Sequence, residues 1–250
     1  MRRLMGMACI VCLAATTPGR ADDAAEARAI VEKAIKALGG ADVLARHNAV
    51  VWKGAGSVTR DGEKHRVTST WSVQGLDRYR WDAEADDGSG QKLLMVLNGD
   101  KGWLKAGTGA TSDFPKDVLA TIRDVLVAVR LMDLPTHLKD SGYTLRPLGE
   151  LKINDQVAVG IKASHKGRPD LDLFFDKKTS LPVRGEVRLK VPSSTDEVAV
   201  AIYFTDYKEF GGRKLATRIT LRADDKEFLE TERTDFKLHE KVEDADFAKP

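Results

Sequence analysis

The side chains that could carry out chemistry in this sequence are few, and they are scattered. The five histidines lack the short spacing that zinc ligands show; they are His47, His65, His137, His165 and His239. The chain contains no Gly-x-Ser-x-Gly nucleophile elbow, no phosphate-binding loop and no His-Glu-x-x-His motif. We therefore predict a protein that is not an enzyme and that uses no metal or cofactor.

Two short stretches resemble binding motifs but do not fit them. The acidic run of residues 82–88 has the composition of a calcium loop, but its glycine falls one place late and Leu93 stands where a bidentate glutamate is needed. A solvated acidic turn explains it better. Gly54 and Gly56 lie within a predicted strand that no helix follows, so they do not form a dinucleotide-binding loop. They indicate instead a place where backbone or a ligand approaches closely.

The tryptophans, by contrast, gather in the first predicted strands. They are Trp52, Trp71, Trp81 and Trp103. Two interpretations stay open, because aromatic side chains commonly carry core packing and also form cavity walls. In the second interpretation, Gly54 and Gly56 leave room for a ligand. Trp103 follows the hairpin turn at Asn98 and Gly99, and for it both core and cavity wall remain open.

The elements that must position these side chains follow an export signal. Arg2 and Arg3 precede an apolar run over residues 4–15, and small residues at Gly19 and Ala21 suit a signal peptidase. The run is shorter than the roughly 20 residues that span a bilayer. We predict a secretory signal peptide over residues 1–21, cleaved after Ala21 and exported by the general secretory route. Residues 22–250 then form a single domain.

Composition narrows the class of the exported chain. Both cysteines, Cys9 and Cys12, lie in the predicted signal peptide, so the remaining chain has no thiol for disulfides, thiolate metal sites or nucleophilic catalysis. That chain carries 37 basic and 38 acidic residues, a net charge of −1. This balance gives no electrostatic footprint for nucleic acid. We expect a soluble, periplasmic monomer.

Two principal helices are predicted from apolar residues at helical spacing. The first covers residues 22–38, ends at Gly39 and Gly40, and is followed by a short helical turn over residues 41–46. The second covers residues 115–134 and is the most hydrophobic segment after the signal peptide. Its broad apolar face suits a lid or plug, and the candidate lid residues are Val118, Ile122, Val125, Leu126, Val129 and Met132.

The rest of the chain alternates apolar and polar residues, which predicts half-buried antiparallel strands. Strands of about ten residues span roughly 33 Å, and a sheet of about a dozen such strands must split into layers or curl. Curling around the helices covers its apolar face. The predicted strands cover residues 49–60, 65–74, 78–85, 92–97, a segment at Trp103, 143–148, 157–164, 171–176, 183–191, 198–207, 214–222 and 228–238.

Several motifs occur together in one order. The helix that ends at Gly39 and Gly40 leads into Ala-Asp-Val-Leu-Ala and the strand Val-Val-Trp-Lys-Gly-Ala-Gly-Ser-Val. The hairpin Asn-Gly-Asp-Lys-Gly-Trp comes next, then the strand-rich stretches 174–189 and 202–221, and the tail Asp-Ala-Asp-Phe-Ala-Lys-Pro. Over nearly the whole exported chain, this order resembles the LolA-like superfamily of outer membrane lipoprotein-sorting proteins. The resemblance implies a mainly β, α+β fold: a half-barrel of about eleven antiparallel strands, curled around helices that form a lid over a hydrophobic cavity.

The leading functional hypothesis is a non-catalytic periplasmic carrier or sensor. Its partner would be a lipid or an acyl-bearing ligand such as a lipoprotein, with envelope membrane proteins as further partners. In the LolA carrier the cavity shields the acyl chains of lipoproteins. The candidate cavity-lining residues here are Trp52, Trp71, Trp81, Met95 and Phe175.

Two other hypotheses remain. The chain could be a structural or interaction scaffold of the cell envelope whose cavity is filled by its own helices. It could also be an enzyme with an unrecognised site, which we rank last because no catalytic group stands out.

Overall fold

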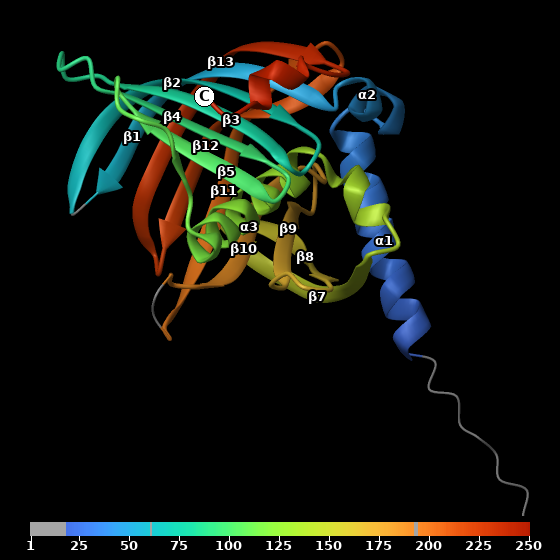
Figure 1. Ribbon diagram of the computed structural model, residues 1–250. Helices are drawn as coiled ribbons and strands as arrows, with labels where there is room; N and C mark the ends of the chain where they lie inside the picture. Colours follow the sequence, from blue (N-terminus) through green and yellow to red (C-terminus); the bar gives the residue numbers. More distant parts are fainter. Residues whose placement is uncertain (1–18, 61, 193–194) are drawn as a thin grey trace, which may run out of the picture.

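The computed structural model describes residues 19–60, 62–192 and 195–250, and in them a single antiparallel sheet curls around a long helix (Figure 1). The predicted signal peptide lies outside the described residues up to position 18. The sheet has thirteen strands in the order β6-β5-β4-β3-β2-β1-β13-β12-β11-β10-β9-β8-β7, and its two edges do not join. The mainly β, α+β fold class is confirmed, with thirteen strands where the alternating pattern predicted about a dozen and the family resemblance implied about eleven.

The helices are α1 (Gly19–Ala37), α2 (Ala41–Arg46) and α3 (Lys116–Asp133), with 3-10 turns η1 (Pro135–Lys139) and η2 (Asp244–Phe247). Both predicted principal helices are confirmed within a few residues. The strands are β1 (Ala49–Arg60), β2 (Glu63–Gln74), β3 (Arg78–Ala85), β4 (Lys92–Asn98), β5 (Lys101–Ala106), β6 (Ser112–Asp113), β7 (Tyr143–Ile153), β8 (Gln156–His165), β9 (Leu171–Asp176), β10 (Pro182–Lys190), β11 (Glu197–Phe210), β12 (Arg213–Ala223) and β13 (Lys226–His239). The two-residue β6 was not predicted, because it is too short to show a period.

The strand order explains why α3 lies inside the curl. Strands β1 to β6 pair in sequence, and so do β7 to β13, while β1 also pairs with β13. The chain therefore leaves the first run at one outer edge and enters the second run at the other. The connection between those edges must cross the sheet, and α3, the broadly apolar helix, makes that crossing over the concave face (Figure 1).

Glycines on both halves of the sheet allow α3 to pack closely. A Cβ at Gly102 of β5 would lie 2.5 Å from Leu119 Cδ1, and one at Gly185 of β10 would lie 2.8 Å from Met132 Sδ. The helix thus contributes to two buried clusters. Its C-terminal half joins the larger one, with α1 and strands β7 to β12, and Leu119 joins a smaller one on β1 to β4.

Trp103 belongs to the convex face, away from α3. Its side chain is 8% exposed and packs with Val96 and with Phe247 of η2. The C-terminal tail is held there by Arg78, which pairs with Asp244 at 2.7 Å, and by Asn98, whose Nδ2 donates to the Phe247 carbonyl oxygen. Of the two roles left open for Trp103, core is the one that the structure shows.

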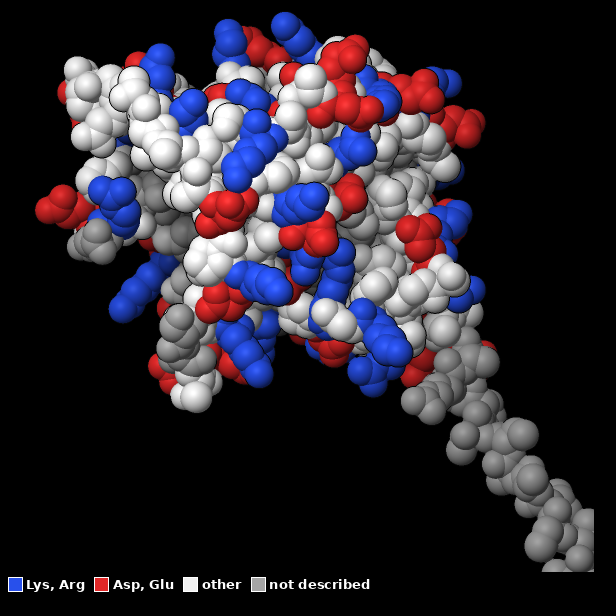
Figure 2. Space-filling view, viewed as in Figure 1, with Lys and Arg blue, Asp and Glu red and all other residues white. Residues whose placement is uncertain are grey.

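The visible surface carries interspersed charges. Figure 2 shows basic and acidic side chains alternating over this face without a large area of one sign. Within the described ranges, no helix combines the length and the apolar character needed to cross a membrane.

Candidate ligand cavity

The tryptophans of the first three strands form one lateral row on the concave face. Trp52 of β1 lies opposite Trp71 of β2, and Trp71 lies opposite Trp81 of β3. Their ring centroids are 5.8 Å and 5.6 Å apart, with interplanar angles of 7° and 28°, so the indoles stack. Met95 of β4 continues the row opposite Trp81. Stacked indoles present a broad apolar surface with little conformational freedom.

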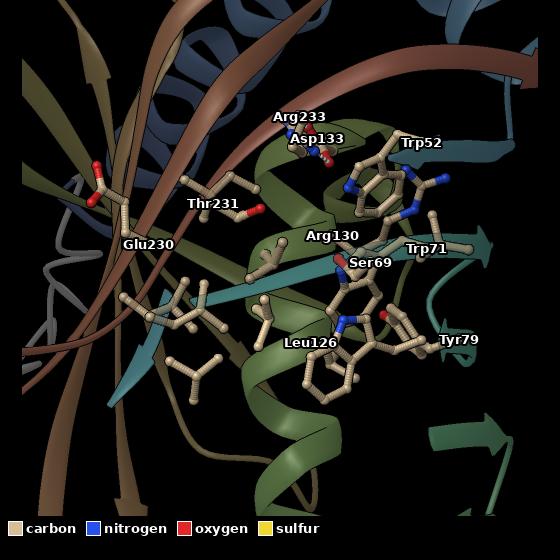
Figure 3. Close-up of a pocket in the computed structure, with 18 of the residues that line it drawn as sticks. Trp52, Ser69, Trp71, Tyr79, Leu126, Arg130, Asp133, Glu230, Thr231 and Arg233 are labelled. Carbon is tan, nitrogen blue, oxygen red and sulfur yellow. Dashed lines mark hydrogen bonds and ion pairs between the residues drawn. The ribbon is translucent and has the colours of Figure 1, made fainter. Parts of the chain in front are cut away.

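A cavity lies between this row and α3 (Figure 3). Its volume is about 90 Å³, counted as the space that the centre of a water molecule can occupy. One water needs roughly 10–15 Å³ on this measure, so the cavity has room for about six to nine water-sized groups. Its lining is mostly apolar and comprises Trp52, Ser57, Val58, Val67, Ser69, Trp71, Val73, Tyr79, Trp81, Leu126, Val129, Arg130, Asp133, Ile219, Leu221, Leu229, Glu230, Thr231 and Arg233.

The two ends of the cavity differ in burial and polarity. At one end, Trp52, Arg130 and Arg233 are at most 6% exposed, beside the C-terminus of α3. At the other end, towards the tips of the strands, Val58, Val67 and Leu229 are half-buried. Figure 3 shows the Asp133–Arg233 pair at the top of the cavity and Glu230 apart from it, at the left. The cavity therefore has a closed, charged end and a mostly apolar passage that leads to the half-buried end, where Glu230 adds a carboxylate to the lining.

The predicted site residues are only partly brought together. Trp52, Trp71 and Trp81 line the cavity, and so do Leu126 and Val129 of the predicted lid. Ile122 packs against the tryptophan cluster, whereas Val125 and Met132 pack in the larger core. Met95 extends the tryptophan row without lining the cavity, and Val118 is half-buried in the first turn of α3. Phe175 is 1% exposed within the larger core on the other half of the sheet.

Gly54 and Gly56, which were expected to leave room for a ligand beside the tryptophans, instead leave room for atoms of the neighbouring strands β2 and β13. A Cβ at Gly54 would lie 2.8 Å from Thr231 Oγ1 and 2.9 Å from Ser69 Oγ. A Cβ at Gly56 would lie 1.9 Å from the carbonyl oxygen of Glu230. Gly56 therefore permits the close approach of a neighbouring backbone, which was one of the two interpretations of these glycines.

Sequence reasoning missed a buried charged cluster at the closed end. Asp133, the last residue of α3, accepts hydrogen bonds from Arg233 of β13 at 3.0 and 3.4 Å. Arg213 of β12 donates to the Asp133 carbonyl oxygen at 2.8 Å. Arg130 of α3 donates to the carbonyl oxygens of Gly75 and Asn48 at 2.9 and 2.6 Å. The available signal was the position of Arg130 and Asp133 within the broad apolar stretch of the second helix.

Burial and mutual repulsion shape the charges of this cluster. Burial by itself would raise the pKa of Asp133, but the neighbouring guanidiniums, Arg233 foremost, lower it instead. Burial, and next the charge of Arg130, lower the pKa of Arg213 to about 9. At neutral pH the carboxylate is thus ionised and Arg213 remains a cation.

The cluster fixes the C-terminal end of α3 to the sheet. It joins the helix to β12 and β13 and to the segment before β1, and the guanidinium of Arg233 also lies 5.4 Å from the centre of the Trp52 ring. The first turns of α3 are held to the sheet by the packing of Leu119 and by an exposed hydrogen bond from Thr121 Oγ1 to the Lys190 carbonyl oxygen at 3.4 Å, with no charged group buried there among the described residues. In the described part of the chain, no three His, Cys, Asp or Glu side chains gather in a way that could hold a metal ion.

Comparison with known proteins identifies the fold. No family model and no curated protein matches the sequence. A LolA superfamily protein from Nitrosomonas europaea aligns over 89% of this chain and 97% of its own, at 15% identity and a TM-score of 0.56. A DUF1329 family protein from Desulfovibrio piger aligns over 89% and 97%, at 13% identity and 0.57. A domain assigned to outer membrane lipoprotein sorting from Vibrio parahaemolyticus aligns over 90% and 97%, at 13% identity and 0.54.

These identities are low, so the likeness concerns the fold alone. The resemblance to the LolA-like superfamily that the motifs suggested is confirmed at that level: the chain has the fold of LolA superfamily structures.

Proposed function

We propose that the chain is a non-catalytic periplasmic carrier or sensor that binds an acyl chain between the tryptophan row and α3. The observation that carries this proposal is the cavity itself, which has an apolar wall of stacked indoles and an apolar helix as its cover. In the proposal, residues 1–21 are removed on export and residues 22–250 act as one domain. The shared fold with lipoprotein-sorting proteins supports this class of function.

The size of the cavity indicates how a ligand would bind. Six buried methylenes contribute roughly 5 kcal/mol at about 0.8 kcal/mol each, which corresponds to a dissociation constant of about 0.2 mM before the costs of association. A longer chain needs more space than the cavity offers. The N-terminal half of α3 would then move outward, turning about the end that Asp133 anchors, or the chain would extend past the half-buried end.

The test is native mass spectrometry of the protein, exported by its own signal to a bacterial periplasm and purified without detergent. We expect stoichiometric lipid or acylated peptide in the spectrum. A clean ligand-free mass, with no uptake of a fluorescent fatty acid afterwards, contradicts the carrier and favours the scaffold with a self-filled interior.

A matched pair of variants tests whether the ligand binds against the tryptophan row. Trp71→Asp puts a carboxylate on the cavity side of β2, whereas Thr70→Asp puts the same group on the exposed side of the same strand. We expect the first to abolish fatty-acid uptake and the second to leave it unchanged. A folded Trp71→Asp protein that takes up lipid as well as the unmodified protein refutes this wall.

A further inference from the structure

The closed end of the cavity holds more positive than negative charge. Arg130, Arg213 and Arg233 are at most 2% exposed, and Asp133 is 5% exposed. Three guanidiniums against one carboxylate leave a formal surplus of +2. The negative charge of Asp133 opposes the effect of burial on both Arg130 and Arg213, whose pKa values burial lowers. Buried charge is costly unless it is paired, so this end is suited to receive a further anion.

Among the described residues, Arg213 Nε at this end has no hydrogen-bond partner, and neither do two donors on side chains that line the cavity. These two donors are Nη1 of Arg130 and Nε1 of Trp52, both buried, on side chains that are 2% and 6% exposed. Both residues line the cavity, and Figure 3 shows them near the Asp133–Arg233 pair. Buried donors are usually satisfied, and a guanidinium together with an indole N–H suits the oxygens of a carboxylate or a phosphate.

Most of the remaining lining is apolar and suits an alkyl chain; the polar exceptions include Ser57, Ser69, Glu230 and Thr231. Leu126 and Val129 of α3 face Ile219 and Leu221 of β12 and the tryptophan row across the cavity. This apolar passage leads from the two free donors to the half-buried end. The polar and apolar parts are therefore arranged along the cavity in the order of the head and the tail of a simple amphiphile.

We infer that the cavity binds a free single-chain lipid with an oxyanion head, entering head first. The head accepts hydrogen bonds from Arg130 Nη1 and Trp52 Nε1 and adds the missing negative charge beside Arg233. The tail lies between α3 and the tryptophan row and leaves through the half-buried end. This inference rests on the proposed carrier function and narrows it, because an acyl chain attached to a protein has no free head to place at the closed end.

The test compares ligands that share a tail and differ in the head. Binding of decanoate, decyl phosphate and decanol at pH 7.5 is measured by quenching of tryptophan fluorescence and by calorimetry, with inorganic phosphate as a tail-free probe. A charge-assisted hydrogen bond in a buried site is worth about tenfold or more in affinity. We expect at least one of the two anions to bind about tenfold more tightly than decanol, and phosphate alone to bind much more weakly than either.

Variants test the assigned donors. Trp52→Phe removes the indole N–H and keeps an aromatic ring, so the preference for the anion over decanol should fall severalfold. Trp81→Phe, the same change farther along the row, should weaken both ligands alike and leave their ratio unchanged. Arg130→Gln should reduce the ratio most, and its folding is checked by circular dichroism. If it does not fold, the two tryptophan variants decide.

Each remaining outcome overturns the inference in a recognisable way. Equal affinity for decanol and for both anions removes the head site and leaves the carrier proposal standing. Phosphate that binds as tightly as decyl phosphate indicates a site for a free anion, without a lipid tail. Failure of all the alkyl ligands to bind removes the head site and the carrier proposal together. An unchanged ratio in Trp52→Phe refutes the role of that indole.

Discussion

Replacing Asp133 with asparagine tests whether the closed end of the cavity depends on a single buried carboxylate. The substitution keeps the shape of the side chain and removes its charge. Arg233, which donates to both carboxylate oxygens, would lose its ionic partner, and the formal surplus of the cluster would rise from +2 to +3. Removing one partner of a buried ion pair typically costs about 3–5 kcal/mol, because the other charge stays buried without compensation.

The assay is urea denaturation of the purified protein, with Asp235→Asn as the matched control. Asp235 lies on the same strand as Arg233 and pairs with Lys53 at 2.9 Å, but both side chains of this pair are more than half exposed. An exposed pair contributes less than about 1 kcal/mol. We expect Asp133→Asn to lower the free energy of unfolding by about 3–5 kcal/mol and the control to change it little.

The pKa shift of Asp133 also predicts how the stability difference between the protein and Asp133→Asn changes with pH. The pKa of Asp133 is lower in the folded protein than its unfolded value of about 3.9, so its contribution is fully present above that value. It is lost as the pH falls through the folded pKa. The difference in stability between the protein and Asp133→Asn should therefore be constant above about pH 5 and shrink below about pH 4.

A loss in Asp133→Asn no larger than that in the control would refute the reasoning. It would mean that the cluster is either solvated or compensated by an anion other than Asp133. A difference that grows towards low pH would refute the assigned direction of the pKa shift.

Three further predictions concern packing. Gly39→Ala should lower the melting temperature more than Gly40→Ala, because both positions have positive φ but only at Gly39 would the new Cβ lie 2.4 Å from the Gly212 carbonyl oxygen. Phe247→Ala should cost about 3–5 kcal/mol in urea denaturation, since the ring is fully buried against the convex face. Leu126→Trp should fill the cavity and block uptake of a fluorescent fatty acid, whereas Leu126→Ala should retain it.

Each of these has a clear contrary result. Equal melting temperatures for the two glycine variants would show that the contact with Gly212 relaxes freely. A loss below about 1 kcal/mol in Phe247→Ala would show that the C-terminal tail is not held by its ring. Undiminished uptake by a folded Leu126→Trp protein would move the ligand away from α3.

The sequence alone determined which segments are helices and which are strands. For most of them it also determined which side chains lie on the buried face. Periods of two and of 3.6 residues are local, since they follow from which side chains lie on one face of a strand or helix. They therefore predicted both principal helices, nearly all of the strands and the apolar character of α3. They could not place Phe174 and Phe175, because β9 is buried on both faces and the period is lost. Phe175 consequently lies in the larger core, away from the cavity lining.

Only the tertiary structure decided which residues meet across strands. Trp52, Trp71 and Trp81 form a row because the registers of β1 with β2 and β2 with β3 set them opposite one another, and a shift of one residue would have turned a tryptophan to the other face. The charged cluster likewise needs β13 to return beside β1 and α3 to end beside both. Pairings between segments about 100 residues apart depend on the balance of many contacts at once, and no local period in the sequence records them.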